Sequence, residues 1–364
     1  MLIDREIIAS KPEDGNADWA IRSEFWIAEG AKCERKRLRR QRNPNALILT
    51  GHGTSLRIEN GALVIREGFT HYPQEQVVHR FFRGDLTLPP RVLLLDGSGT
   101  LSFEVLSWLA EQNVPLARVT WDGEVATIAS GSGAIGDMAK VNWQRDTLKD
   151  DCQRMAFVID LMSRKFANSC SALEAHVPPS SERDRAIVKA SEGASRLRNG
   201  LIRDMNCVRA IEGEIASAYF GAWRGITLNW TATKRFPIQE PWQSYSSRSS
   251  ILTGHKKKNR KASHPLNAML NYAYAVRQSE LQIQAVADGY DPRIGIMHHQ
   301  SEGRAAFILD LIEPERPKVD GLILDFAASR TFSAADFIIR SDGACRLSPQ
   351  MARMVAKLVT HYKN

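Results

Sequence analysis

Cysteine is scarce in this 364-residue sequence, and long apolar runs are absent from it. The five cysteines (Cys33, Cys152, Cys170, Cys207 and Cys345) are dispersed, and no two of them form a CxxC pair. This argues against a disulfide framework and a zinc ribbon, and it suits the reducing cytosol. No apolar run approaches the ~18 residues of a membrane span, and the first residues lack a signal-peptide layout. We therefore expect a soluble, cytoplasmic protein without a membrane partner.

Acidic residues are outnumbered, since 49 Lys and Arg stand against 41 Asp and Glu, for a net charge of +8. A composition of 43% hydrophobic and 25% charged residues excludes collagen-like and wholly disordered chains. Seven of the eleven residues 32–42 are basic, as are five of the six residues 256–261. Each run is either a solvated surface segment or a nucleic-acid contact, and the sequence leaves both interpretations open.

The N-terminal half divides into an extension and a β-rich domain. Residues 1–45 form a basic N-terminal extension, which we expect to be partly helical. Residues 46–130 carry short apolar or alternating runs between turn residues, a pattern typical of strands. The runs are separated at Gly51-His52-Gly53, at Asn60-Gly61, which predicts a tight hairpin, and at Asp96-Gly97.

Two further elements are expected within 46–130. Residues 102–112 predict a short helix with Ser102 as its N-cap and with Phe103, Leu106 and Leu109 on one side. The runs 116–119 and 125–129 flank a turn and predict a second hairpin.

The C-terminal half has a helical period. Residues 131–136 match GxGxxG, but no βαβ unit surrounds them, so we interpret them as an interdomain linker rather than a nucleotide site. Residues 137–364 predict a mostly helical domain, with two long helices on either side of Pro178-Pro179 and a third from Leu266 to about Ala287. The predicted fold class is α+β multidomain: a β-rich N-terminal domain followed by a mostly α-helical C-terminal catalytic domain.

Glu212 interrupts an apolar helical stripe, four residues after Val208 and three before Ile215. A carboxylate on a buried face is costly unless it is ion-paired, hydrogen-bonded or bound to a metal. A buried ion pair or a helix-edge position is the structural alternative for this glutamate.

Asp310 and Glu313 interrupt a second apolar run, and a helix would place both on one face. Pro314 limits that face to a single turn, and Arg316 offers Glu313 a simple salt bridge instead. His298-His299 is the third polar feature, and at least one of the two is expected to be structural. Together, Glu212, Asp310 and Glu313 with one imidazole and no thiolate suit Mg²⁺ or Mn²⁺ better than zinc.

An ordered set of segments resembles the CRISPR-associated integrase family, CRISPR-associated protein one, over about residues 46–364. The segments are Ile211-Glu212-Gly213 with Tyr219-Phe220, His264-Pro265-Leu266-Asn267-Ala268 through Tyr274, Gly289-Tyr290-Asp291-Pro292 with Gly295-Ile296-Met297-His298, and Asp310-Leu311-Ile312-Glu313-Pro314 with Arg316-Pro317. Two positions depart from the family pattern: Ala306 stands where serine is common, and Glu315 replaces an aromatic residue.

The resemblance implies a β-rich domain used for dimerisation and a helical domain that holds Mg²⁺ or Mn²⁺. It makes Glu212, His298 and Glu313 the metal ligands and Asp310 a fourth catalytic residue. It also implies a homodimer that assembles with CRISPR-associated protein two and inserts short captured DNA into the repeat array through attack by a 3′-hydroxyl.

Phosphate contacts are expected from six basic side chains in and before the second basic run: Arg248, Lys256, Lys257, Lys258, Arg260 and Lys261. Three alternatives stay open: a standalone integrase or transposase relative, a nuclease for branched DNA, and a non-catalytic DNA-binding scaffold.

Overall fold

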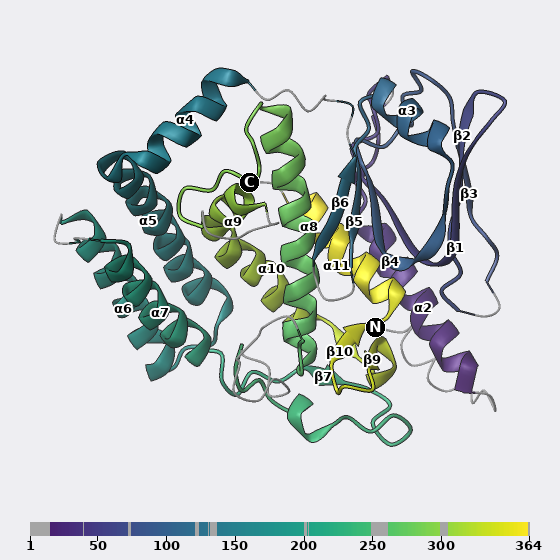
Figure 1. Ribbon diagram of the computed structural model, residues 1–364. Coiled ribbons are helices and arrows are strands. Elements are labelled where there is room, and N and C mark those ends of the chain that lie inside the picture. Colours follow the sequence, from purple (N-terminus) through teal and green to yellow (C-terminus); the bar gives the residue numbers. More distant parts are fainter. Residues whose placement is uncertain are drawn as a thin grey trace.

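The computed structural model describes residues 15–38, 40–71, 74–120, 124–129, 131, 137–199, 202, 204–248, 261–298 and 305–362. It combines one six-stranded sheet with a larger set of helices, which confirms the predicted α+β class (Figure 1). Residues 132–136 of the expected linker, the tip of the hairpin at 121–123, residues 256–260 and His299 lie outside these ranges.

A mixed six-stranded sheet occupies the region expected to be β-rich. Its strands are β1 (Leu47–Glu59), β2 (Ala62–Arg66), β3 (Val78–Phe81), β4 (Val92–Leu101), β5 (Leu116–Val119) and β6 (Val125–Ala129). Their order is β3-β2-β1-β4-β5-β6, with β4 parallel to β1 and β5 and the other neighbours antiparallel. The hairpin at Asn60-Gly61 is confirmed: both residues have positive φ, as a tight primed turn requires.

The glycines at 51, 53 and 97 do not end strands, contrary to the prediction. β1 and β4 continue through them side by side, with register shifts between Thr50 and Thr54. Gly51 and Gly97 have φ values of +91° and +73°, and a Cβ on Gly97 would lie 2.0 Å from the Gly51 carbonyl oxygen. Glycine therefore permits a bulge at this close approach of two backbones.

The short helix α3 (Phe103–Glu111) covers one face of the sheet. Its buried residues are Val105, Trp108 and Leu109, whereas Phe103 is 86% exposed and Leu106 is 39% exposed. The predicted apolar side is therefore wrong for two of its three members, because the helix turns the i, i+3, i+4 set toward the strands. Ser102 is the N-cap residue, but its side chain makes no capping bond to the backbone.

The remaining helices of the described residues lie beyond the sheet and α3. They are α2 (Gly15–Lys32), α4 (Met138–Lys149), α5 (Asp151–His176), α6 (Ser181–Arg198), α7 (Met205–Gly221), α8 (Pro265–Ala287), α9 (Ala306–Ile312), α10 (Arg316–Ser329) and α11 (Pro349–His361). Short 3₁₀ turns η1 (Glu240–Trp242), η3 (Glu313–Glu315) and η4 (Ala334–Asp336) and the small strands β7 (Asn229–Trp230), β8 (Thr331–Phe332), β9 (Phe337–Ile339) and β10 (Cys345–Leu347) complete it.

Four helices, rather than two long ones, lie between residues 138 and 221. Asp150 accepts from the backbone of Cys152 and Gln153 and thereby starts α5. Asp204 caps α7 in the same way through Asn206 and Cys207. These side-chain caps divide the apolar stripe, because each one satisfies the free N–H groups of a new helix start. Pro178-Pro179 lies between α5 and α6.

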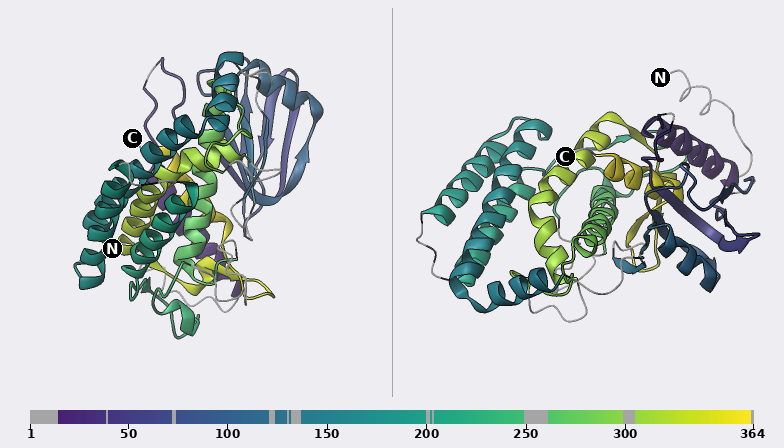
Figure 2. Two further views of the ribbon diagram at one scale, coloured as in Figure 1. Left: turned by 60° about the vertical axis from the view of Figure 1, so that its left-hand side comes forward. Right: turned by 90° about the horizontal axis from the view of Figure 1, so that it is seen from above.

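The buried helix α8 runs between the sheet and the helical layer α5–α7 (Figures 1 and 2). Its start at Pro265 confirms the predicted third helix, with the His264 ring accepting from the backbone of Leu266. α8 and α11 cover the face of the sheet opposite α3. α2 packs on α11, and its Trp26 is buried in the main core, so the helical part of the N-terminal extension is integral to the fold. Among the helices in the described ranges, none has the length and apolar character that a membrane crossing needs.

Candidate functional site

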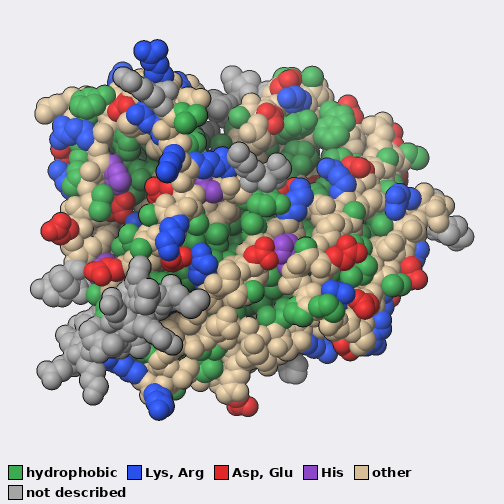
Figure 3. Space-filling model, turned by 180° about the vertical axis from the view of Figure 1, so that it is seen from behind, with side chains coloured by type: hydrophobic (Ala, Val, Ile, Leu, Met, Phe, Trp, Pro, Cys, Tyr) green, Lys and Arg blue, Asp and Glu red, His purple; other side chains and the backbone are tan. Residues whose placement is uncertain are grey.

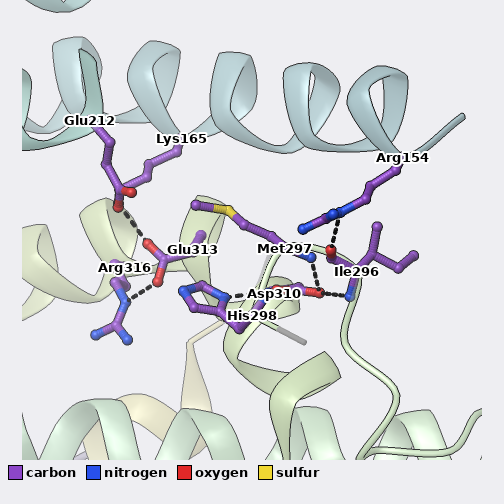
Figure 4. Close-up of polar contacts among 9 residues, drawn as sticks. All are labelled: Arg154, Lys165, Glu212, Ile296, Met297, His298, Asp310, Glu313 and Arg316. Atoms are coloured by element: carbon purple, nitrogen blue, oxygen red, sulfur yellow. Dashed lines mark hydrogen bonds and ion pairs between the residues drawn. The ribbon is translucent and has the colours of Figure 1, made fainter. Parts of the chain in front are cut away.

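Asp310 and Glu313 lie where α9 passes through the 3₁₀ turn η3 into α10. Pro314 occupies the first turn of η3, where its missing N–H costs little, so the chain continues beyond the single turn expected. Both carboxylates are buried, at 0% exposure for Asp310 and 5% for Glu313. They serve different partners, since Asp310 contacts the 296–298 segment and Glu313 contacts α5 and α10 (Figure 4).

Asp310 fixes the position of His298. Its Oδ2 accepts from the backbone of Ile296 at 2.6 Å and of Met297 at 3.1 Å. Its Oδ1 accepts from the backbone N–H of His298 at 3.0 Å and lies 2.7 Å from the His298 Nδ1. This contact leaves Nε2 as the ring nitrogen that Asp310 does not engage, the arrangement in which carboxylates hold metal-binding histidines.

Lys165 joins Glu212 to Glu313. Its Nζ lies 2.6 Å from Glu212 Oε1 and 2.6 Å from Glu313 Oε2 (Figure 4). This residue is not among those predicted from the sequence, although Lys165 falls on the stripe of Leu161 and Met162, just as Glu212 falls on the stripe of α7. A lysine and a glutamate interrupting apolar stripes on two packed helices are a signal that the sequence does contain.

Arg316 provides the second cation for Glu313, with its Nε 3.0 Å from Oε1. The salt bridge that the sequence left open is thus present, and Glu212 has an ion pair that is partly buried. Burial alone would raise the pKa of Glu313, but the charges of Arg316 and Lys165 outweigh it and lower that pKa to about 2. Glu313 is therefore a carboxylate throughout the neutral range.

The charges of the site also act on its bases. Burial disfavours the charged forms of Lys165 and His298, yet the pKa of each is raised. For Lys165 the charges of Glu313 and Glu212 prevail, and for His298 the hydrogen bond and charge of Asp310 do, assisted by Glu313 and Glu212. Glu212, Glu313 and His298 therefore share one electrostatic environment.

The segment leading to His298 is attached to α4 and α5. The fully buried Gln144 donates to the carbonyls of Asp291 and Ile294, and Arg154 Nε donates to the carbonyl of Ile296 at 3.0 Å (Figure 4). The hydrogen bonds of these two residues hold the backbone of the segment in place. Neither residue was predicted from the sequence.

The predicted DNA-contacting residues are only partly within the described ranges. Arg248 donates to Asn271 at 2.7 Å, and both Arg248 and Arg316 lie near the ring of Tyr274. Lys261 pairs with Asp342 at 2.8 Å. Lys256, Lys257, Lys258 and Arg260 lie outside the described residues, so their role stays a prediction.

The types of donor atom at this site suit a divalent metal, but the side chains are not arranged around an ion. Two carboxylates and an imidazole with no thiolate form a donor set for Mg²⁺ or Mn²⁺. Within the part of the chain that the structure describes, however, no three His, Cys, Asp or Glu side chains are already placed to hold an ion. The Lys165 ammonium is the cation between Glu212 and Glu313.

Comparison with known proteins identifies the family. The model of the family "CRISPR associated protein Cas1" matches residues 47–361, which is most of the chain. The CRISPR-associated endonuclease Cas1 1 of Pyrobaculum aerophilum is 31% identical over 166 residues, 43% of this chain and 46% of the relative. A Cas4/Cas1 fusion of Rhodospirillum rubrum is 27% identical over 72% of this chain, which spans only 42% of that protein. The Cas1 1 protein of Archaeoglobus fulgidus is 23% identical over 85% of both chains.

Solved structures share the fold at low sequence identity. A casposase bound to integration product superposes with a TM-score of 0.69 at 21% identity, over 86% of this chain and 81% of that one. A Cas6-RT-Cas1–Cas2 complex superposes with a TM-score of 0.62 at 16% identity, over 89% of this chain and 33% of that one. Because the family model covers nearly the whole described structure, the chain belongs to the CRISPR-associated protein Cas1 family.

Proposed function

We propose that the chain is a metal-dependent DNA integrase and endonuclease of CRISPR adaptation. The observation that carries the proposal is the meeting of Glu212, Glu313 and His298 in one partly buried site, where Lys165 and Arg316 oppose the carboxylate charges, inside the family-matched range. Relatives described as CRISPR-associated endonucleases support the reaction class. In this reaction the 3′-hydroxyl of a short captured DNA forms a bond to a repeat phosphorus while the phosphorus–oxygen bond to the leaving strand breaks.

Glu212, His298 and Glu313 would hold the divalent metal, Mg²⁺ or Mn²⁺. When bound, the metal would polarise the scissile phosphate and stabilise charge on the leaving oxygen. Asp310 would act as a positioning residue, because its contact with Nδ1 directs the lone pair of neutral His298 onto Nε2. A bound cation would take over from Lys165 the neutralisation of the two carboxylates.

Arg316 and Arg248 would attract the DNA backbone to this site. Both guanidinium groups lie near the ring of Tyr274, at 4.8 and 5.7 Å from its centroid. A cation stacked on an aromatic ring keeps its charge and a fixed plane, which suits phosphate binding. We propose that Lys261 and the basic residues 256–260 extend this contact without reading sequence.

A homodimer and a second protein are part of the proposal. A chain of the structure described as a Cas6-RT-Cas1–Cas2 complex shares this fold over 33% of its own length, which supports CRISPR-associated protein two as a partner here. The β-rich domain would supply the dimer interface.

A strand-transfer experiment tests the reaction and the site together. Wild type and the Glu212→Ala and His298→Ala variants are mixed with Mn²⁺ or Mg²⁺, a labelled short duplex and a supercoiled plasmid that contains repeats. The control is Glu214→Ala, because Glu214 lies on α7 but is exposed and pairs with Lys189. We expect metal-dependent joining by wild type and by the control, and none by the two site variants. Equal joining by all four proteins would overturn the site assignment.

A standalone integrase is the second candidate. The casposase structure, described as bound to an integration product, has a TM-score of 0.69, against 0.62 for the Cas6-RT-Cas1–Cas2 complex. A plasmid lacking repeats separates the candidates: joining that is equally efficient without repeats favours the standalone integrase, and joining that needs them favours CRISPR adaptation.

A further inference from the structure

A basic loop precedes the family-matched part of the chain. We use the name "basic loop" for residues 34–45, between α2 and β1. It contains six Lys or Arg residues and one acid, Glu34. The family match begins at residue 47, so the loop is an addition to the part of the chain that carries the site.

Hydrogen bonds hold the base of the loop. Asn45 closes it by accepting from the Arg35 backbone at 3.0 Å and donating to the Arg35 carbonyl at 2.8 Å. The Arg35 guanidinium donates to the carbonyl of His361, at the end of α11, at 2.6 Å. Asn43 bonds to the carbonyls of Leu86 and Thr87, after β3. The loop is therefore anchored to both the helical part and the sheet, and it does not behave as a free tail.

The cations beyond this base are exposed and largely unpaired. Lys36, Arg37, Arg40 and Arg42 are all exposed. Among the ion pairs formed by described residues, none includes any of these four, and the single acid Glu34 pairs with Lys357 on α11. Hydrogen bonds from Thr87, with the charge of Arg37 as a smaller cause, lower the pKa of Asp85, so one acid outside the loop lies within electrostatic reach of Arg37. Six cations against Glu34 and Asp85 still leave an excess of positive charge, whose repulsion a bound polyanion would relieve.

Several other surface cations are paired with acids. On α6, Arg185 pairs with Glu182, while Lys189 and Arg196 both pair with Glu214. On the face seen in Figure 3, Lys and Arg side chains are interspersed with Asp and Glu rather than gathered alone. The basic loop differs from these paired surfaces, because no described ion pair includes Lys36, Arg37, Arg40 or Arg42.

The composition of the loop indicates the kind of ligand. Five of its six cations are arginines, whose guanidinium groups match phosphate oxygens in pairs. The loop has no aromatic residue on which an unpaired base would stack, so it is suited to a duplex backbone rather than to a single strand. That the polyanion is DNA rests on the proposed function.

We propose that the basic loop is a second DNA-binding surface, which contacts the phosphate backbone of duplex DNA independently of sequence. It lies outside the family-matched range and adds to the contacts proposed around Arg248 and residues 256–261.

The test measures duplex affinity against salt concentration. A variant with Lys36→Gln, Arg37→Gln, Arg40→Gln and Arg42→Gln keeps Arg35 and Asn45, which hold the base of the loop. The control carries Arg185→Gln, Lys189→Gln, Arg196→Gln and Arg198→Gln on α6, which remove the same charge. Binding of a labelled random-sequence duplex is measured in EDTA from 50 to about 300 mM NaCl, after thermal unfolding has verified that both variants fold.

We expect the loop variant to bind about tenfold or more weakly at 50 mM salt, with a salt slope shallower by roughly 2 to 4. The control should keep a slope close to that of wild type. Equal salt slopes for the two variants would overturn the inference. It would also be overturned if the loop variant bound DNA as wild type does but no longer associated with CRISPR-associated protein two, because the loop would then be a protein-docking surface. If wild type itself bound no duplex, the proposed function would fail instead, and the strand-transfer experiment reads that separately.

Discussion

Replacing Asp310 with asparagine should release His298 from its position. The wild-type carboxylate makes four hydrogen-bond contacts, two at each oxygen. Oδ2 contacts the backbone N–H groups of Ile296 and Met297, and Oδ1 contacts the backbone N–H and the ring Nδ1 of His298. Asparagine keeps one accepting oxygen, so its NH₂ group must face two donors in either orientation. Because Asp310 is fully buried, water cannot replace the lost acceptor.

The magnitude follows from those two contacts. A hydrogen bond to a charged group contributes about 1.5–3 kcal/mol, so losing two predicts a fall of roughly 3–5 kcal/mol in the free energy of unfolding, after some relaxation. The matched control is Asp325→Asn, because Asp325 lies on the following helix α10, is 63% exposed and, among the described ion pairs, takes part in the one with His176. It should change stability by less than about 1 kcal/mol.

Denaturant unfolding of the three proteins measures the difference, and the imidazole resonances of His298 report its environment. We expect Asp310→Asn to be much less stable than the control and to join DNA as poorly as His298→Ala. If Asp310→Asn unfolds within about 1 kcal/mol of wild type and leaves the His298 resonances in place, the assignment of Asp310 as the positioning residue is wrong.

Three further predictions concern buried charges. Lys165→Met leaves two carboxylates without their shared cation, so the free energy of unfolding in EDTA should fall by about 3–5 kcal/mol. Mn²⁺ should restore part of the thermal stability. Equal melting of variant and wild type in EDTA would contradict this. Burial raises the pKa of Asp320 to about 6 despite hydrogen bonds from two tyrosines, so the folded state binds this proton more tightly than the unfolded state. Stability should therefore fall as pH rises from about 4 to 6, by up to roughly 3 kcal/mol, and unfolding of Asp320→Asn across that range should lack this component; identical pH profiles would refute it. Glu280→Gln weakens the ion pairs that Glu280 makes with Arg91 of the sheet region and Arg277 of α8, and it should lower the free energy of unfolding by about 2–3 kcal/mol. The control Glu111→Gln changes an exposed ion pair and should lower it by under about 0.5 kcal/mol. Equal effects in denaturant unfolding would show that burial does not decide the difference.

Local residue patterns in the sequence predicted some turns and helix starts of the fold. Asn60-Gly61 predicted its hairpin because only residues that tolerate positive φ form that turn. Pro265 marked the start of α8 because a helix start needs no N–H there. The prediction failed at Gly51 and Gly97, where glycine permits a close approach between strands rather than a chain reversal, and at Asp150 and Asp204, whose capping divides the helices. Whether a glycine reverses the chain and whether an aspartate caps a helix depend on the backbone groups that lie next to it in space. The spacing of residues in the sequence does not reveal these neighbours.

For the site, the sequence by itself determined the chemical types and their order: Glu212, His298, Asp310 and Glu313, with an ordered set of motifs that resembled the family. Only the tertiary structure decided their roles. It separated Asp310, which holds His298, from Glu313, which faces the cations, although the two lie three residues apart. It also placed Lys165 between carboxylates that are 47 and 148 residues distant in sequence. Charge balance in a buried site depends on distance in space, because Coulomb interactions decay with separation and strengthen with desolvation, and neither quantity can be read from the order of residues.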